Sequence, residues 1–163
     1  MKTQLLVNAF GPDRPGIVAR LSEIVSEHGA NLEASRMALL GGEFAAITLV
    51  SVPSERVKEL ESALATLKNE GLTVLCKQTQ GAGPERFAGY SFFSISLSGA
   101  DHEGIVHKLS SHLRDLKINI LKAETDFVNA PETGSPLFTM NAEIAVPPSI
   151  SFDELCKDLG KIA

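Results

Sequence analysis

The sequence contains one stretch of residues twice, and this repeat constrains the fold more than any other feature. Residues 11–18 read GPDRPGIV and residues 99–106 read GADHEGIV, so their shared glycines, aspartate and Ile-Val pair all lie 88 positions apart. The same spacing persists in three further identities: Leu21/Leu109, Ser22/Ser110 and Asn31/Asn119. A repeat kept in register over this length predicts two copies of one structural unit.

A second pair of matching segments follows at a different spacing. Residues 44–53 resemble residues 138–147, which lie 94 positions later, so six residues have entered the second copy between the two blocks. They fall in NAPETGS, residues 129–135, where the first copy has only Gly41-Gly42. Two glycines between β-rich segments are typical of a two-residue hairpin turn, and a hairpin tip tolerates insertion at little cost.

The first copy predicts six elements in the order βαββαβ. Apolar runs and alternation favour strands over residues 4–10, 31–40, 43–52 and 72–77. Helical spacing of apolar residues favours one helix from Pro15 to Gly29 and another from Pro53-Ser54 to Gly71. This order gives an antiparallel sheet with both helices packed on one face, the α+β arrangement called ferredoxin-like.

The second copy repeats this order but runs out of residues before its last strand. Strands are expected over 90–98, 118–128 and 136–146, with helices from Ile105 and over 151–161. Either the sequence is shorter than the natural one, or a neighbouring strand fills the gap. We therefore expect a first domain over residues 1–78, a linker over 79–88, and a second domain over 89–163 that lacks its final strand.

Composition excludes several classes of partner. The net charge is −5 and the sequence has no concentrated Lys/Arg cluster, which argues against direct binding of nucleic acid. No stretch approaches 18 apolar residues, so no membrane span is expected. The two cysteines, Cys76 and Cys156, show no CxxC spacing and are expected to be reduced and buried in a cytoplasmic protein.

The motif D-R-P-G-[IV], followed about fifteen residues later by G-x-N-[LI], resembles the ACT domain family. Within that family the sequence resembles the tandem repeats of the glycine cleavage system repressors, over residues 4–78 and 90–161. The same signature opens formyltetrahydrofolate deformylases and some phosphoserine phosphatases. Those enzymes carry a catalytic domain after it, for which this chain is expected to have no room.

The resemblance implies that a ligand binds at ACT–ACT interfaces, on the loop after the first strand and at the start of the second. The matching positions in the first copy are Gly11, Asp13, Arg14, Pro15, Gly16 and Asn31. In the second copy they are Asp101, Gly104 and Asn119. The second copy departs from the pattern at His102 and Glu103, where the first has Arg14 and Pro15, so the two copies are not expected to bind equally well.

These residue types suit a zwitterionic amino acid. Amide N–H groups at a helix N-terminus can bind a carboxylate, and Gly16 allows close approach of the backbone. Asp13 could accept from an ammonium group, or could simply cap the helix. Asn31 offers both donors and an acceptor, or could be a left-handed turn residue after Gly29. Together they predict a polar crevice where a helix tip meets a strand start.

Other chemistry is not expected. His102, His107 and His112 are spaced by five, whereas ligands on one helical face need spacings of three or four, so no metal site is predicted. The sequence has no GxSxG, GxGxxG or P-loop motif, which argues against catalysis and against a bound cofactor.

The sequence therefore favours an amino-acid-sensing regulatory protein. By the resemblance, the ligand is glycine or a similar small amino acid, and the partner is a transcriptional regulator. Two alternatives remain at this point. One is an interaction module that forms a homodimer or docks a protein partner without any small ligand, and the other is the regulatory half of a deformylase or phosphatase.

Overall fold

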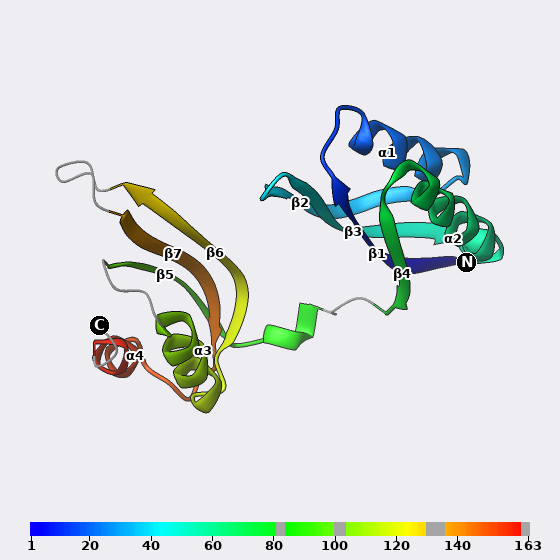
Figure 1. Ribbon diagram of the computed structural model, residues 1–163. Coiled ribbons are helices and arrows are strands. Elements are labelled where there is room, and N and C mark those ends of the chain that lie inside the picture. The colour runs from blue at the N-terminus through cyan, green and yellow to red at the C-terminus, as the bar shows by residue number, and fades with distance from the viewer. Residues whose placement is uncertain (81–83, 100–103, 130–135, 161–163) are drawn as a thin grey trace. The chain divides into compact units, whose positions relative to one another are not determined.

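The computed structural model describes residues 1–80, 84–99, 104–129 and 136–160, and the chain divides into two compact units. The first unit is Met1–Gly83 and the second is Pro84–Ala163. In each unit the helices cover one face of an antiparallel sheet (Figure 1). The α+β fold with two ferredoxin-like halves, predicted from the repeat, is confirmed.

The first unit has a four-stranded sheet in the order β2-β3-β1-β4. Its strands are β1 (Lys2–Pro12), β2 (Asn31–Leu40), β3 (Glu43–Pro53) and β4 (Thr73–Thr79). Side chains alternate along β1, so that Leu5, Val7 and Ala9 are buried on one face. Gly41 and Gly42 join β2 to β3 with φ of 60° and 84°, the positive angles that a two-residue hairpin turn requires, as predicted.

Two helices bury that face of the first sheet. Helix α1 (Ile17–Glu27) contributes Ile17, Leu21, Ile24 and Val25 to the core. Helix α2 (Val57–Ala65) contributes Val57, Leu60 and Leu64. The apolar residues recur at helical spacing, which is why each helix presents a single buried stripe. The face opposite the helices is left for other contacts.

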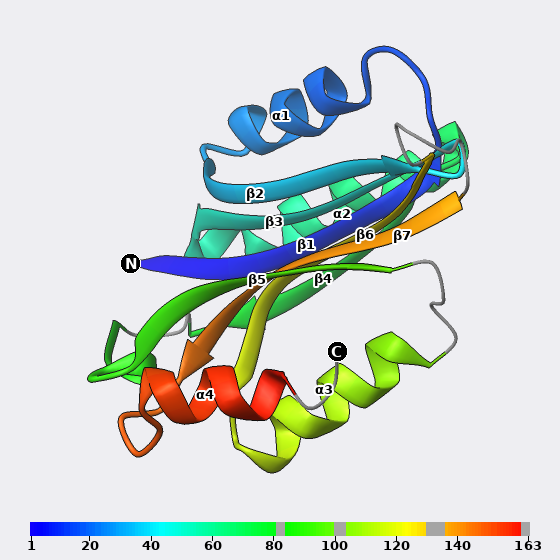
Figure 2. The same cartoon turned by 90° about the vertical axis from the view of Figure 1, so that its left-hand side faces the viewer.

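The second unit has three strands among its described residues, in the order β5-β7-β6. These are β5 (Ser91–Gly99), β6 (Asn119–Asn129) and β7 (Pro136–Val146). Helices α3 (Ile105–Asp115) and α4 (Phe152–Leu159) lie beside one another (Figures 1 and 2). Helix α4 begins with a capping box, in which Ser151 Oγ accepts from the Glu154 amide and Glu154 Oε2 accepts from the Ser151 amide.

The linker holds one further element, and the prediction of two buried cysteines needs correction. The predicted linker contains a 3₁₀ helix, Pro84–Phe87, whose Phe87 ring packs 5.4 Å from Tyr90. Of the two cysteines expected to be buried, Cys76 is half-buried in β4, and burial raises the pKa of its thiol to about 11. Cys156 is exposed, because it lies one position past Leu155 and outside the buried stripe of α4.

Candidate functional site

The loop after β1 lies at one end of the first sheet, and its geometry is set by Gly11. A Cβ atom on Gly11 would lie 2.5 Å from the carbonyl oxygen of Gly71, in the turn before β4. Only glycine permits this approach of two backbones. Gly11 therefore has a structural reason for its identity, whatever its contact with a ligand.

Arg14 is held by Glu70 at this same end of the sheet. Its Nη2 donates to Glu70 Oε2 at 2.8 Å and to the Glu70 carbonyl at 3.3 Å. Arg20 Nε also donates to Glu70, at 3.3 Å. The hydrogen bond from Arg14 is the main reason that the pKa of Glu70 is lowered, with a further contribution from Arg20. Nη2 of Arg14 is thus engaged by Glu70, and the side chain remains partly exposed.

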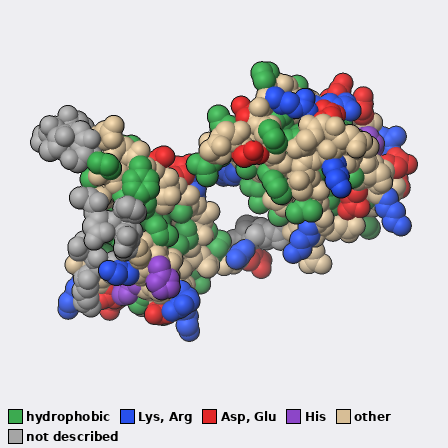
Figure 3. Space-filling model, in the orientation of Figure 1, with side chains coloured by type: hydrophobic (Ala, Val, Ile, Leu, Met, Phe, Trp, Pro, Cys, Tyr) green, Lys and Arg blue, Asp and Glu red, His purple; other side chains and the backbone are tan. Residues whose placement is uncertain are grey.

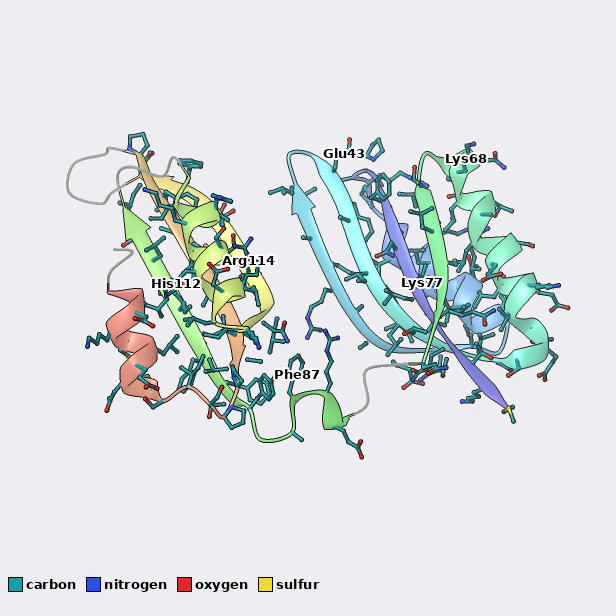
Figure 4. The ribbon with its side chains drawn as sticks, turned by 90° about the horizontal axis from the view of Figure 1, so that it is seen from below. Glu43, Lys68, Lys77, Phe87, His112 and Arg114 are labelled. Carbon is teal, nitrogen blue, oxygen red and sulfur yellow. The ribbon has the colours of Figure 1, made fainter. Side chains whose placement is uncertain are left out.

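The remaining loop residues lead into α1. Gly16 precedes the helix in the left-handed region, with φ of 95°, and no side chain caps the helix N-terminus. The N-cap role considered for Asp13 is therefore wrong. The Asp13 amide instead donates to the Gly42 carbonyl at 3.1 Å, which ties the loop to the hairpin, and Pro15 and the Asp13 side chain are exposed. Glu43 and Lys68, which are labelled in Figure 4, lie at the same end of the first sheet as this loop.

Asn31 lies at the other end of the sheet, within a small polar network. It pairs with Ser51 across β2 and β3. Glu33 Oε1 accepts both from Asn31 Nδ2, at 3.2 Å, and from Ser51 Oγ, at 2.5 Å, and Ser51 is only 6% exposed. Both hydrogen bonds lower the pKa of Glu33, and the one from Ser51 has the larger effect. The network therefore holds a carboxylate that stays ionised over the physiological range.

Asn31 is not a left-handed turn residue. That conformation belongs to Gly29, with φ of 64°, and Asn31 is the first residue of β2. The amide of Ala30 closes the helix by donating to the Val25 carbonyl at 3.1 Å. The turn interpretation of Asn31 is therefore wrong, and its side chain is available for the network described above.

The Asn31 network borders an open polar recess of about 840 Å³. The side chains that line it come from the ends of all four strands and carry hydroxyl, amide or charged groups: Lys2, Thr3, Gln4, Glu33, Ser51, Gln78, Thr79 and Gln80. Sequence reasoning missed Glu33 because a β-bulge between Leu32 and Ala34 takes it out of the alternation of β2. A bulge of this kind leaves no clear mark in the sequence.

The second unit carries the same bulge with different residues. The register shift there lies between Ile120 and Lys122, so Leu121 stands 88 positions after Glu33, and it is 44% exposed. Asn119 pairs with Ala145, which replaces Ser51. The second unit thus keeps the asparagine but has lost the carboxylate and the hydroxyl. Gly104 precedes α3 with φ of 73°, and Asp101 lies outside the described residues.

Within one unit, the predicted loop residues after the first strand do not lie near the predicted asparagine at the start of the second strand. Pro12 pairs with Glu43, whereas Asn31 pairs with Ser51, eight residues further along β3. At a rise of ~3.3 Å per residue this separates them by roughly 26 Å. In the second unit Gly99 pairs with Phe138 and Asn119 with Ala145, again near opposite ends. The expected crevice with Asp13 and Asn31 side by side is therefore not formed by one unit.

The part of the chain that the structure describes offers no cluster of His, Cys, Asp and Glu side chains suited to a metal ion. His102, one of the three histidines considered, is outside the described residues. Within the described ranges, no helix combines the length and apolar character needed to cross a bilayer. Basic and acidic side chains are interspersed on the face shown in Figure 3.

Comparisons with known proteins agree with this fold. The profile of the ACT domain matches residues 3–77. The glycine cleavage system transcriptional repressor of Escherichia coli is 44% identical over 71 residues, which are 44% of this chain and 37% of the repressor. The match thus spans little more than a third of that relative's length.

Solved structures extend the likeness to the whole chain. A protein of unknown function from Galdieria sulphuraria is 31% identical, with a TM-score of 0.84 over 99% of this chain and 92% of that one. A "putative glycine cleavage system transcriptional repressor" is 20% identical, with a TM-score of 0.74 over 99% and 91% of the two chains, and this likeness concerns the fold alone. The ACT domain profile thus matches the first unit, and the chain as a whole carries two ferredoxin-like, ACT-like units in tandem.

Proposed function

We propose that this chain is a regulatory protein of the cytoplasm that binds a small amino acid and reports it to a transcriptional regulator. The match of its first unit to the ACT domain profile and its 44% identity to a transcriptional repressor over 71 residues support a regulatory role. The structural observation that carries the proposal is the ionised Glu33, held by Ser51 and Asn31 beside a polar recess.

The network suits the ammonium group of an amino acid. Both hydrogen bonds from the protein go to Glu33 Oε1, so neither occupies Oε2. A carboxylate that is positioned by charge-assisted or short hydrogen bonds accepts well from an ammonium group. Lys2, whose charge also favours the ionised form of Glu33, lines the same recess and can pair with the ligand carboxylate.

The loop residues lie outside this site. Gly11, Asp13, Arg14, Pro15 and Gly16 are at the far end of the first sheet from Asn31, roughly 26 Å away at ~3.3 Å per residue. Because Leu121 and Ala145 replace Glu33 and Ser51, the Asn119 position is the weaker binder of the two. We therefore expect one kind of strong site in each chain, built on Asn31.

Calorimetry and thermal melting with each of the twenty amino acids test this proposal. A true ligand at about 100 times its dissociation constant stabilises the folded chain by roughly 2.7 kcal/mol. Glu33→Gln and Asn31→Ala should weaken binding, whereas Asn129→Ala, an exposed change at the end of β6, should not. A chain that melts identically with every amino acid, yet associates as its concentration rises, would instead be a ligand-free interaction module.

A further inference from the structure

The second unit carries two cations near the turn after α3 that the first unit lacks. The spacing of 88 carries Ser26 and Gly29 onto Arg114 and Lys117. Asn119, the first residue of β6, follows two positions after Lys117. The second unit therefore has positive charges at the end of the sheet where the first unit has its ionised carboxylate network.

Lys117 holds a side chain in a conformation that favours glycine. Its φ is 58°, and Gly29 in the first unit has the same left-handed conformation with φ of 64°. A side chain is disfavoured there because its Cβ crowds the backbone. The dipole of α3 does not require this charge, since Arg114 already lies in the last turn of the helix. A lysine held against its backbone preference points to a function of its side chain.

Both cations line an open recess of about 400 Å³ between the end of α3 and the start of β6. The recess combines these cations with an amide, a hydroxyl and two apolar side chains: Ser110, Arg114, Lys117, Ile118, Asn119 and Ile120. None of these side chains is acidic. Its field therefore attracts an anion and repels the ammonium group that suits the first unit.

The recess offers N–H donors that are not engaged by any described residue. Arg114 donates from Nε and Nη2 to Asp115 Oδ1, at 2.9 Å and 2.8 Å, which leaves Nη1 unused. Across the described ranges, Lys117 forms no ion pair and the side chain of Asn119 forms no hydrogen bond. All three donor side chains are exposed, so an incoming anion can reach them directly.

We propose that this recess binds the phosphate group of a small phosphorylated molecule. A phosphate monoester carries about two negative charges at pH 7 and has three strong acceptor oxygens. These oxygens match the donors of Arg114, Lys117 and Asn119, and the guanidinium can donate as a planar fork. A volume of about 400 Å³ lies within the range of small-molecule sites.

Binding should depend on both cations. The carbonyl oxygens at the C-terminal end of α3 carry the negative end of the helix dipole, so the backbone there does not favour an anion. The Arg114 and Lys117 side chains must therefore supply the attraction. This requirement distinguishes the recess from an anion site at a helix N-terminus, where backbone amides contribute.

The probe is methyl phosphate, titrated into the full chain at pH 8 and constant ionic strength. Amide signals of Lys117 and Asn119 are followed by nuclear magnetic resonance. We expect saturable shifts centred on these two residues. Acetate, which carries one charge, should bind roughly fivefold more weakly.

Lys117→Gly removes the charge and relieves the left-handed backbone in one step. It should melt no lower than the natural chain and yet bind methyl phosphate roughly fivefold more weakly, so misfolding cannot explain the loss. Arg114→Gln should weaken binding by a similar factor, and Lys117→Arg should restore it. Lys157→Gln, which removes one positive charge on α4 outside the recess, is the matched control and should bind normally.

Unchanged binding by Lys117→Gly would overturn the proposal, as would equal losses in Lys117→Gly and Lys157→Gln. Acetate that binds as tightly as methyl phosphate would also overturn it. A phosphoserine peptide that binds more tightly than methyl phosphate would show that the partner is a protein and not a small molecule. The recess and the Asn31 network lie in different units, so Glu33→Gln should leave methyl phosphate binding unchanged. Failure of either proposal leaves the other intact.

Discussion

The guanidinium of Arg14 lies 2.8 Å from the carboxylate of Glu70, and this contact ties the loop after β1 to the turn before β4. Gly11 and Gly71 approach each other across the same two segments. Two independent contacts thus fix the position of a loop on which the ACT resemblance places ligand-binding residues. Changes in that loop should be transmitted to the 3₁₀ helix Thr66–Glu70, which follows α2.

The contact between Arg14 and Glu70 should depend on pH. The pKa of Glu70 is lower in the folded chain than in the unfolded one. The ion pair therefore stabilises the folded chain fully above the ordinary carboxyl pKa of ~4.3, and this stabilisation is lost as the pH falls through the lowered pKa of the folded chain. Glu70→Gln should release the loop at pH 7 much as acid does in the natural protein. The measurement is the hydrogen-exchange rate of the Asp13 amide, which should be faster in Glu70→Gln than in the natural protein. Glu23→Gln, which removes only a partner of Arg20, should leave that amide protected.

Gly11→Ala should destabilise the first unit. The new Cβ would meet the Gly71 carbonyl at 2.5 Å, and this contact is with backbone, which cannot rotate away. We expect a loss of about 1–3 kcal/mol in the free energy of unfolding, measured by urea titration. Gly160→Ala is the matched control, since its Cβ would make only ordinary contacts of 3.4 Å or more. Equal stability of the two variants would show that the turn at Gly71 yields easily.

Lys117→Gly should stabilise the second unit. Lys117 has φ of 58° and stands 88 positions after Gly29, whose φ is 64°. Both units close their first helix with the same turn, and the Ile118 amide donates to the Leu113 carbonyl at 2.8 Å. The left-handed conformation costs a side-chain-bearing residue about 1 kcal/mol, which glycine avoids. A higher melting temperature of the second unit is expected, and Lys122→Gly, in the extended strand β6, should instead lower it.

The two thiols should react at very different rates. Burial raises the pKa of Cys76 to about 11, so little thiolate is present at pH 8, whereas Cys156 is exposed. A thiol reagent should therefore show one fast phase in the folded chain, and Cys156→Ser should remove it. Urea should make Cys76 fast as well. Two fast phases without denaturant would mean that β4 opens readily from the sheet.

The repeat and the apolar patterns suffice to predict the order of elements, because each element carries its own periodicity and each boundary its own turn residue. Gly41-Gly42 is an example, since both residues adopt the positive φ that their sequence implies. The chain also holds enough information to place Asp13 and Asn31 apart, because α1 returns the chain to the other end of the sheet before β2 begins. The prediction that Asp13 and Asn31 lie side by side is wrong because α1 runs the length of the sheet between them.

Other features of the site could not be predicted. The Asn31–Glu33 contact depends on a bulge, and the Arg14–Glu70 ion pair joins residues 56 positions apart. Asp13 looked like a helix cap because α1 was expected to start near Pro15, whereas the left-handed Gly16 delays the helix to Ile17. Such details are set by tertiary packing rather than by local propensity.

The partly covered core of the second unit has a thermodynamic consequence. Residues such as Ile95 and Phe152 are only partly covered in the described part of this unit, so any segment that covers them in the folded form adds to its stability. When such a segment is added in increasing amounts, the melting temperature of this unit should rise. The first unit, whose sheet already has its fourth strand, should melt at a temperature that stays constant across the same series.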